Sequence, residues 1–336
     1  TRPLLPVDET RYASVAWEMW LRGDFLGPYL NGEPYSHKPP LYFWLIHAGW
    51  WLFGVHEWVV RMVAPLLVLL ILLATSVLSR QLWPADRGAS RLAPWLVFGT
   101  TFFTAFLSWV QFDLLLVLMV LLALLGMVRA AQDVSTGWLL SGVAMGLGVL
   151  SKGPVILLYV LPIALLAPLW RRSNTRKAWW HWYGGMVVSV LIAAGIALAW
   201  ALPAAQAGGE AYHEAILWGQ TANRMVQSFA HAHPAWWYLP WLPALFAPWV
   251  LLPWAWSAVR RCRVADDMGL RLCLTWLIAG LLVMSLISGK QVKYLLPLLP
   301  AVALLLARVW SRLDDRPVMQ RPWLLSGVLL ATGGVL

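Results

Sequence analysis

The sequence predicts an all-α protein, built as a polytopic bundle of transmembrane helices. Of its 336 residues, 60% are hydrophobic and 12% carry a charge, whereas about a quarter of a typical soluble domain is charged. Charge-free apolar runs such as 62–79 approach the roughly 18 to 20 residues that cross a bilayer. Many of the 25 Trp lie near the ends of such runs, as in the aromatic belts of membrane proteins.

The apolar runs define the predicted elements in chain order. The first run, 41–53, is too short to span a bilayer and suits an interfacial or re-entrant segment. Pro39 and Pro40 stand where its helix would begin, a position that proline tolerates well. The predicted spans that follow are 59–82, 92–110, 114–128, 138–150, 155–170, 182–202, 237–259, 272–287, 294–307 and 324–336.

We expect these elements to form a single transmembrane core over 1–336. A long first outer loop, 1–58, would carry interfacial helices, and a second polar outer loop would lie at about 206–236. Because the sequence starts without Met and stops inside an apolar run, we expect it to be a piece of a longer protein, shortened at both ends.

The placement of basic residues predicts which side each loop faces. With 41–53 counted as non-spanning, most of the 25 Lys and Arg fall on one side, which the positive-inside rule makes cytoplasmic. The loops on that side are 80–91, 129–136, 171–181, 260–271 and 308–321. The net charge of +10 therefore reports topology rather than nucleic-acid binding. If 41–53 spanned the bilayer instead, the first outer loop alone would change sides.

The polar stretch 8–44 is the strongest candidate for a functional loop. Asp8 and Glu9 form a carboxylate pair just before Arg11, and a carboxylate there could act as a general base or stabilise a cationic transition state. The alternative for Asp8 is a helix N-cap. Lys38 follows a turn at 31–34 and suits a phosphate; the alternative is a lysine that snorkels to the interface.

Further charged residues fall in other outer connections, far away in sequence. Charges near the membrane interface are costly unless they are paired, so a functional role is the default interpretation. The alternative for Asp113 is again a helix cap. The candidates are Asp113, Lys152, Arg224, Lys290 and Lys293.

Metal and nucleotide motifs give little support for other chemistry. The sequence contains no Walker loop, dinucleotide glycine fingerprint, HExxH or GxSxG motif. Cys262 and Cys273 have no metal-site spacing and are interpreted as free thiols. His231 and His233 form only a weak metal motif.

The stretch DETRYASVAWEMWLRGDFLGPYLNGEPYSHKPPLYFWL, from Asp8 onward, resembles the first outer loop of bacterial GT-C glycosyltransferases. The similarity is to the superfamily of aminoarabinose transferases and protein mannosyltransferases. Later features match in the same order: Asp113, then Lys152 followed by glycine, and GKQVKYLLPLLP at 289–300. The resemblance covers nearly the whole chain and implies a transmembrane bundle of the GT-C type.

The resemblance implies an inverting transfer of a sugar from a polyprenyl-phosphate donor to an acceptor. The acceptor would be lipid A-like, a protein or another glycan, at the periplasmic face of a bacterial inner membrane. Asp8 would be the catalytic carboxylate, with Arg11 and Asp113 supporting it. Phosphate groups of donor, carrier or acceptor would meet Lys38, Arg224, Lys152, Lys290, Lys293 and Tyr294.

The resemblance leaves the cofactor open. Aminoarabinose transferases have a carboxylate immediately before the lysine that corresponds to Lys38, whereas this chain has His37. A divalent metal ion is therefore a candidate cofactor only, with Glu9 and His37 as the residues that could hold it.

Two rival functions remain at this stage. A transporter or flippase of lipid-linked substrates predicts charges near the bilayer midplane and internal repeats. A surface-polysaccharide polymerase or ligase would use the same class of donor. The enzyme interpretation predicts that Asp8, Lys38 and Asp113 converge on one outward cavity.

Overall fold

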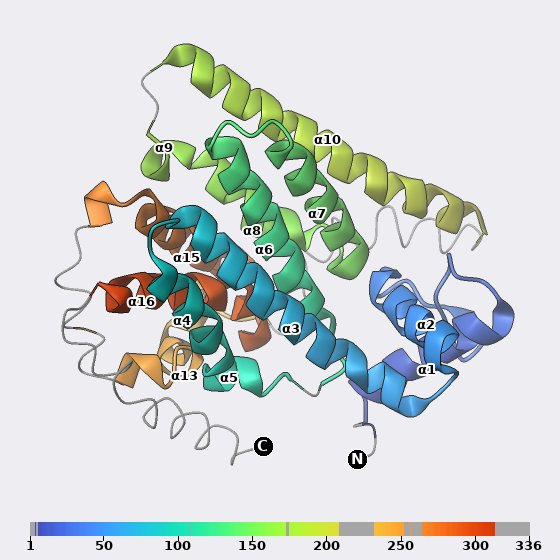
Figure 1. Ribbon diagram of the computed structural model, residues 1–336. Coiled ribbons are helices and arrows are strands. Elements are labelled where there is room, and N and C mark those ends of the chain that lie inside the picture. Colours follow the sequence, from blue (N-terminus) through green and yellow to red (C-terminus); the bar gives the residue numbers. More distant parts are fainter. Residues whose placement is uncertain are drawn as a thin grey trace.

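A computed structural model describes residues 4, 6–107, 109–172, 175–207, 232–251, 256 and 264–312 of the chain. The described chain is almost entirely helical, which confirms the predicted fold class (Figure 1). Its strands, among the described residues, are β1 (Tyr29–Leu30) and β2 (Glu33–Pro34), an antiparallel hairpin.

Five helical segments are long and apolar enough to cross a membrane. They are α3 (Glu57–Leu82), α6 (Phe112–Ala131), α10 (Arg176–Ala207), α15 (Met268–Leu286), and the 3-10 helix η5 (Val292–Leu298) continued by α16 (Leu299–Ser311). Shorter apolar helices are α2 (Leu41–Phe53), α7 (Gly137–Lys152) and α8 (Val155–Leu165). Their number and apolarity make this a multi-pass membrane protein.

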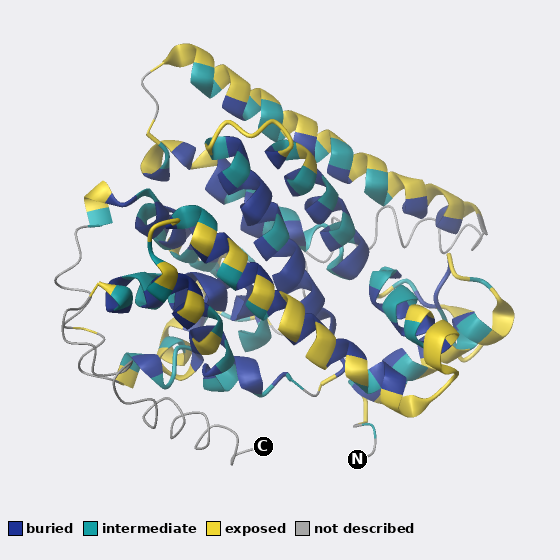
Figure 2. Ribbon diagram, in the orientation of Figure 1, coloured by how far each residue is buried: buried dark blue, intermediate teal, exposed yellow. Residues whose placement is uncertain are grey.

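Helix α6 lies at the centre of the bundle and contacts α3, α7, α8 and η5. Nearly all of its side chains are buried, whereas α3 and α10 expose one side along their length (Figure 2). The exposed residues of α10 include Val187 and Leu191, which are apolar. Such a face suits lipid rather than water.

Close helix contacts in the centre depend on small residues. A Cβ added to Gly126 of α6 would lie 2.5 Å from the backbone nitrogen of Ser141 in α7. Only glycine permits this approach, so α6 and α7 pack with their backbones nearly touching.

The N-terminal segment, 8–53, forms two helices beside one end of the bundle (Figure 1). Helix α1 (Asp8–Arg22) ends at Gly23, whose φ of 64° is the left-handed conformation of a helix C-cap. Helix α2 begins after Pro40 and ends at Gly54, as the predicted short segment requires. Between them, Asn31 and Gly32 have positive φ in the hairpin turn, which confirms the turn predicted at 31–34.

The predicted span 92–110 is wrong. Helix α4 (Arg87–Phe98) ends early, and a single turn, α5 (Thr101–Thr104), follows. The cause is Trp249, whose ring lies where a Cβ of Gly99 would be and whose Nε1 donates to the Leu96 carbonyl at 3.0 Å and to Thr100 Oγ1 at 3.0 Å.

The predicted span 237–259 also differs over the described residues 235–251. That part consists of short turns, with Pro240, Pro243 and Pro248 interrupting any longer helix. The turns are η2 (Ala235–Trp241), α13 (Leu242–Leu245) and η3 (Trp249–Leu251). Two further short elements are α9 (Ala167–Trp170) and η4 (Val264–Asp266).

An ion-pair cluster stabilises the end of the bundle at which the basic loops lie. Arg308 of α16 contacts Asp86 at 2.5 Å and Asp267 at 3.1 Å, and Arg312 contacts Asp267 at 3.1 Å. Asp267 also accepts a hydrogen bond from Trp83 Nε1 at 2.7 Å. The cluster therefore ties the turn after α3 to the start of α15 and the end of α16.

Candidate active site

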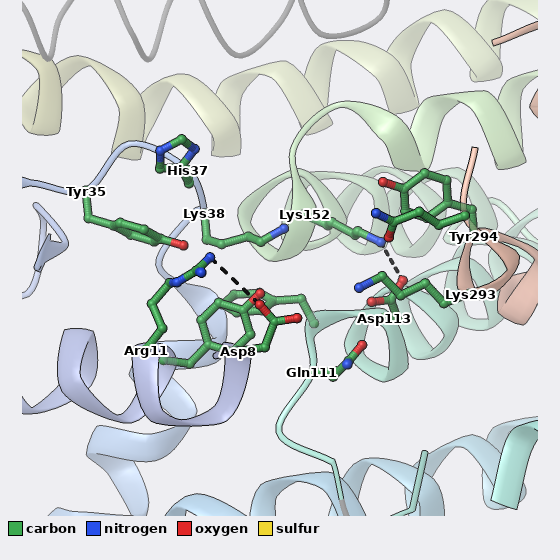
Figure 3. A pocket seen from close by; sticks show the side chains of 13 residues that line it. Asp8, Arg11, Tyr35, His37, Lys38, Gln111, Asp113, Lys152, Lys293 and Tyr294 are labelled. Atoms are coloured by element: carbon green, nitrogen blue, oxygen red, sulfur yellow. Dashed lines mark hydrogen bonds and ion pairs between the residues drawn. The ribbon is translucent and has the colours of Figure 1, made fainter. Parts of the chain in front are cut away.

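A polar pocket lies at the other end of the bundle, where α1, the start of α6, the end of α7 and the start of η5 meet (Figure 3). Asp8, Lys38 and Asp113 all line it, so the predicted convergence on one cavity occurs. The complete lining is Asp8, Arg11, Tyr12, Tyr35, His37, Lys38, Gln111, Phe112, Asp113, Lys152, Gln291, Lys293 and Tyr294.

Asp8 is the more accessible carboxylate of the pocket. It lies in the first turn of α1, and Val7 rather than Asp8 occupies the N-cap position. Its side chain is 40% exposed, and its Oδ1 lies 3.8 Å from Arg11 Nη1. A contact of that length between half-exposed groups is weak, so Asp8 keeps oxygens available for a ligand.

Tyr12 places a neutral phenol beside Asp8. Burial raises the pKa of Tyr12 well above its usual value, and the nearby carboxylates raise it further, while Arg11 acts in the opposite direction. The ring packs edge-on against Phe112, with 4.9 Å between centroids. Tyr12 therefore stays protonated and can donate a hydrogen bond.

Asp113 is the buried carboxylate of the pocket. It is the second residue of α6 and only 4% exposed, and its Oδ1 lies 2.5 Å from Lys152 Nζ. Gln111, not Asp113, holds the N-cap position. Lys152 is the last residue of α7, and Gly153 has a φ of 84° where the chain turns away. Asp113 is thus committed to an ion pair across the α6–α7 contact.

Lys38 reaches the pocket from the end of the hairpin segment. The hairpin is braced by Glu18 of α1, which accepts hydrogen bonds from the backbone of Gly32 at 2.9 Å and from Arg22 at 2.7 Å. The Lys38 ammonium lies 5.6 Å from the centroid of the Phe112 ring. Lys38 therefore joins the pocket lining beside Phe112, just before α2 begins.

The side chains of Lys290 and Lys293 have different surroundings, although the two residues are close in sequence. Lys293 lines the pocket. Lys290 does not; it is 2% exposed, and its Nζ donates to the carbonyl of His233 at 2.9 Å and to that of Ile287. This geometry favours a bracing role for Lys290 over the predicted phosphate contact. Arg224 lies outside the described residues.

The two candidate metal ligands are not both in the pocket. His37 lines it, whereas Glu9 is buried and its Oε1 accepts a hydrogen bond from the backbone of Val110 at 3.0 Å. Among the described residues, no group of three His, Cys, Asp or Glu side chains could hold a metal ion. The described residues of the pocket therefore do not fit a metal site.

Several pocket residues were not predicted as site residues. They are Tyr12, Tyr35, Gln111, Phe112 and Gln291. The glutamines follow a pattern that could have been noticed, because each comes two residues before a predicted charged residue and each is the N-cap of the helix that follows.

The fold and pocket define a class: a polytopic helical membrane protein with carboxylates and cations gathered at one end of its bundle. Residues 37–200 match the family model described as dolichyl-phosphate-mannose-protein mannosyltransferase. The chain is 32% identical over 320 residues to an undecaprenyl phosphate-alpha-4-amino-4-deoxy-L-arabinose arabinosyl transferase of Erwinia tasmaniensis, covering 91% of this chain and 55% of that protein. A protein of the same description from Sodalis glossinidius is 34% identical over 328 residues, covering 94% and 56%.

A solved structure shares the fold. The crystal structure of ArnT from Cupriavidus metallidurans bound to undecaprenyl phosphate matches with a TM-score of 0.80 at 22% identity, over 97% of this chain and 60% of that one. These sequence matches support the superfamily of aminoarabinose transferases and protein mannosyltransferases that the sequence motifs predicted. The chain spans about half the length of the curated relatives it matches.

Proposed function

We propose that this chain is the transmembrane core of a glycosyltransferase. It transfers a sugar, with inversion, from a polyprenyl-phosphate donor to an acceptor at the periplasmic face of a bacterial inner membrane. The single observation that carries the proposal is the shared pocket, in which Asp8 and Asp113 meet Arg11, Lys38, Lys152 and Lys293. The names of its relatives support the same donor class.

The charge balance of the pocket supports an anionic ligand. Cations outnumber carboxylates among the lining residues, and Asp113 already neutralises Lys152. Lys38 and Lys293 add two further ammonium groups to the lining that a phosphate would meet. A lysine acts there as a point charge, which suits a phosphate that loses its sugar and gains negative charge.

The two carboxylates suit different roles. Asp113 is buried and paired, so it holds Lys152 in place. Asp8 is half-exposed and only weakly paired, so it faces the reacting sugar. As the bond between the anomeric carbon and the phosphate oxygen breaks, positive charge grows on the sugar and the Asp8 carboxylate stabilises it.

The acceptor takes the place of the departing phosphate on the sugar. Its oxygen forms a bond to the anomeric carbon on the face opposite the departing phosphate, which inverts that centre. A hydroxyl acceptor gives its proton to Asp8 as general base. A phosphate acceptor, such as one on a lipid A-like molecule, is already an anion and needs no base. The carrier leaves as a polyprenyl phosphate.

The rival transporter function is less consistent with the position of the charges. Asp113 is at the start of α6, Lys152 at the end of α7 and Lys293 at the start of η5. All three therefore lie at helix ends rather than in the middle of a span, where a transporter holds its substrate. A polysaccharide polymerase or ligase would share this pocket, and only the acceptor distinguishes it.

The test compares the glycoconjugates of cells that contain the full-length protein with those of cells that lack it. Lipid A, envelope proteins and surface glycans from cells with and without the protein are compared by mass spectrometry. We expect one of these classes to lose a single sugar unit when the protein is absent. Loss of a transported lipid intermediate, with every glycoconjugate retaining its full sugar complement, would contradict the proposal and favour a transporter.

A further inference from the structure

Gln111 occupies a central place in the pocket that the proposed reaction does not yet use. It is the N-cap residue of α6, two positions before Asp113, and its side chain makes no capping hydrogen bond. It lies between Asp8 and Asp113 along the pocket lining (Figure 3). Gln111 therefore shares one lining with the two carboxylates.

The backbone around Gln111 is fixed on both sides. The N–H of Val110 donates to the buried carboxylate of Glu9 at 3.0 Å. The ring of Phe112 packs against that of Tyr42, with 4.8 Å between centroids. A side chain that starts from such an anchored backbone is pre-organised to contact a ligand.

The amide oxygen of Gln111 lacks a protein partner. The residue is 7% exposed, and its Oε1 is buried without a hydrogen-bond partner in the described part of the chain. Buried polar atoms in folded proteins are almost always hydrogen-bonded. The terminal torsion of glutamine is soft, so this oxygen can turn toward a ligand without breaking any protein hydrogen bond of its own.

The chemistry of the pocket indicates what this oxygen accepts. The cations of the pocket suit phosphate, the Asp113 carboxylate already faces Lys152 at 2.5 Å, and Asp8 is assigned to the charge on the anomeric carbon. Gln111 adds a neutral acceptor. A phosphodiester has no hydrogen to donate, whereas the ring of a sugar carries hydroxyl or amino hydrogens.

We propose that Gln111 determines specificity for the transferred sugar, by accepting a hydrogen bond from one hydroxyl or amino group of the sugar ring. The inference rests on the proposed glycosyltransferase function and adds a residue that recognises the sugar itself. A site built to pair with a particular polar group disfavours an analogue that lacks it, because its own polar atom is then left unpaired.

The experiment compares sugar donors with the full-length protein in lipid nanodiscs. The donors are a polyprenyl-phosphate sugar that the protein uses and analogues that each lack one ring hydroxyl or amino group. The variants are Gln111→Met and a matched control, Gln132→Met, at the opposite end of the same helix, where Gln132 bonds the Gln81 carbonyl. Thermal unfolding is measured for each variant.

Gln111→Met is expected to lower kcat/KM for the complete donor about tenfold. One analogue should react equally well with wild type and Gln111→Met, which identifies the group that Gln111 contacts. A second variant, Gln111→Glu, keeps an acceptor oxygen and should retain the preference for that group. The control should change neither activity nor preference.

For Gln111→Met, an equal loss for every donor or no loss for any donor would overturn the inference. A Gln111→Glu variant that folds but shows no preference for the group would overturn it as well. These outcomes leave the proposed function intact, because wild type still transfers the sugar. Failure of the wild-type protein to transfer sugar from any polyprenyl-phosphate donor would instead remove the proposed function itself.

Discussion

Lys152 Nζ lies 2.5 Å from Asp113 Oδ1, and this pair joins the end of α7 to the start of α6. Both side chains are largely buried, with 11% and 6% exposure. A buried ion pair adds little compared with apolar packing, but removal of one partner leaves a charge buried and unpaired. The pair is therefore sensitive to single substitution in a way that exposed pairs are not.

We expect Lys152→Met to destabilise the protein by about 3–5 kcal/mol, because the buried Asp113 carboxylate loses the ammonium group that contacts it directly. The double variant Asp113→Asn with Lys152→Met should recover a large part of that loss, since no buried charge remains. Unfolding in detergent, followed at several denaturant concentrations, measures the free energy of unfolding of the double variant and of each single variant, Asp113→Asn and Lys152→Met. If the double variant is as unstable as the sum of the two single variants, the two residues are not coupled.

Lys290 and Lys293 provide a matched pair of substitutions. Lys293→Met should lower kcat/KM for the donor about tenfold while the unfolding temperature stays unchanged, because a pocket cation is removed. Lys290→Met should lower the unfolding temperature, since two carbonyls lose their buried donor. Thermal unfolding and transfer assays on both variants check this. The reverse assignment of effects would show that Lys290 contacts the phosphate.

Acid should destabilise the end of the bundle that carries the ion-pair cluster of Asp86, Asp267 and Arg308. Burial alone would raise the pKa of Asp86 and Asp267, but hydrogen bonds from Ser311 and Trp83, respectively, together with contacts to Arg308, lower both pKa values below the ordinary range. A depressed carboxyl pKa contributes stability above the unfolded value, near 4, and that stability is lost as pH falls through the folded value. We therefore expect the contribution of these two carboxyl groups to stability to be constant from pH 7 to 5 and to decline below about pH 4.

The variant Asp267→Asn tests the source of this acid sensitivity. Its unfolding free energy should be lower than that of wild type at pH 7, and it should decline less steeply in acid, because one of the two titrating groups is gone. Unfolding curves at several pH values measure the difference. A wild-type stability that rises below pH 4 would have the wrong sign for depressed carboxyl pKa values.

The sequence predicted the helical class, the short apolar helix at 41–53 and the convergence of Asp8, Lys38 and Asp113 on one pocket, because hydrophobic run lengths and loop charges are local properties. It failed at 92–110, where the helix ends against Trp249, a residue about 150 positions away. It also grouped Lys290 with Lys293, although the Lys290 side chain is buried against the His233 carbonyl and only Lys293 lines the pocket. The direction of a side chain depends on such distant contacts, which no local pattern contains.

The most direct measurement is a single-turnover transfer assay with a defined polyprenyl-phosphate sugar, using wild type, Asp8→Asn and Asp133→Asn. Asp133 is a suitable control because its side chain is 91% exposed and its φ of 63° suits asparagine. We predict that Asp8→Asn slows transfer by a factor of roughly 100 to 10,000 at an unchanged unfolding temperature, and that Asp133→Asn transfers at the wild-type rate. Wild-type transfer by a folded Asp8→Asn protein would contradict the central role of Asp8.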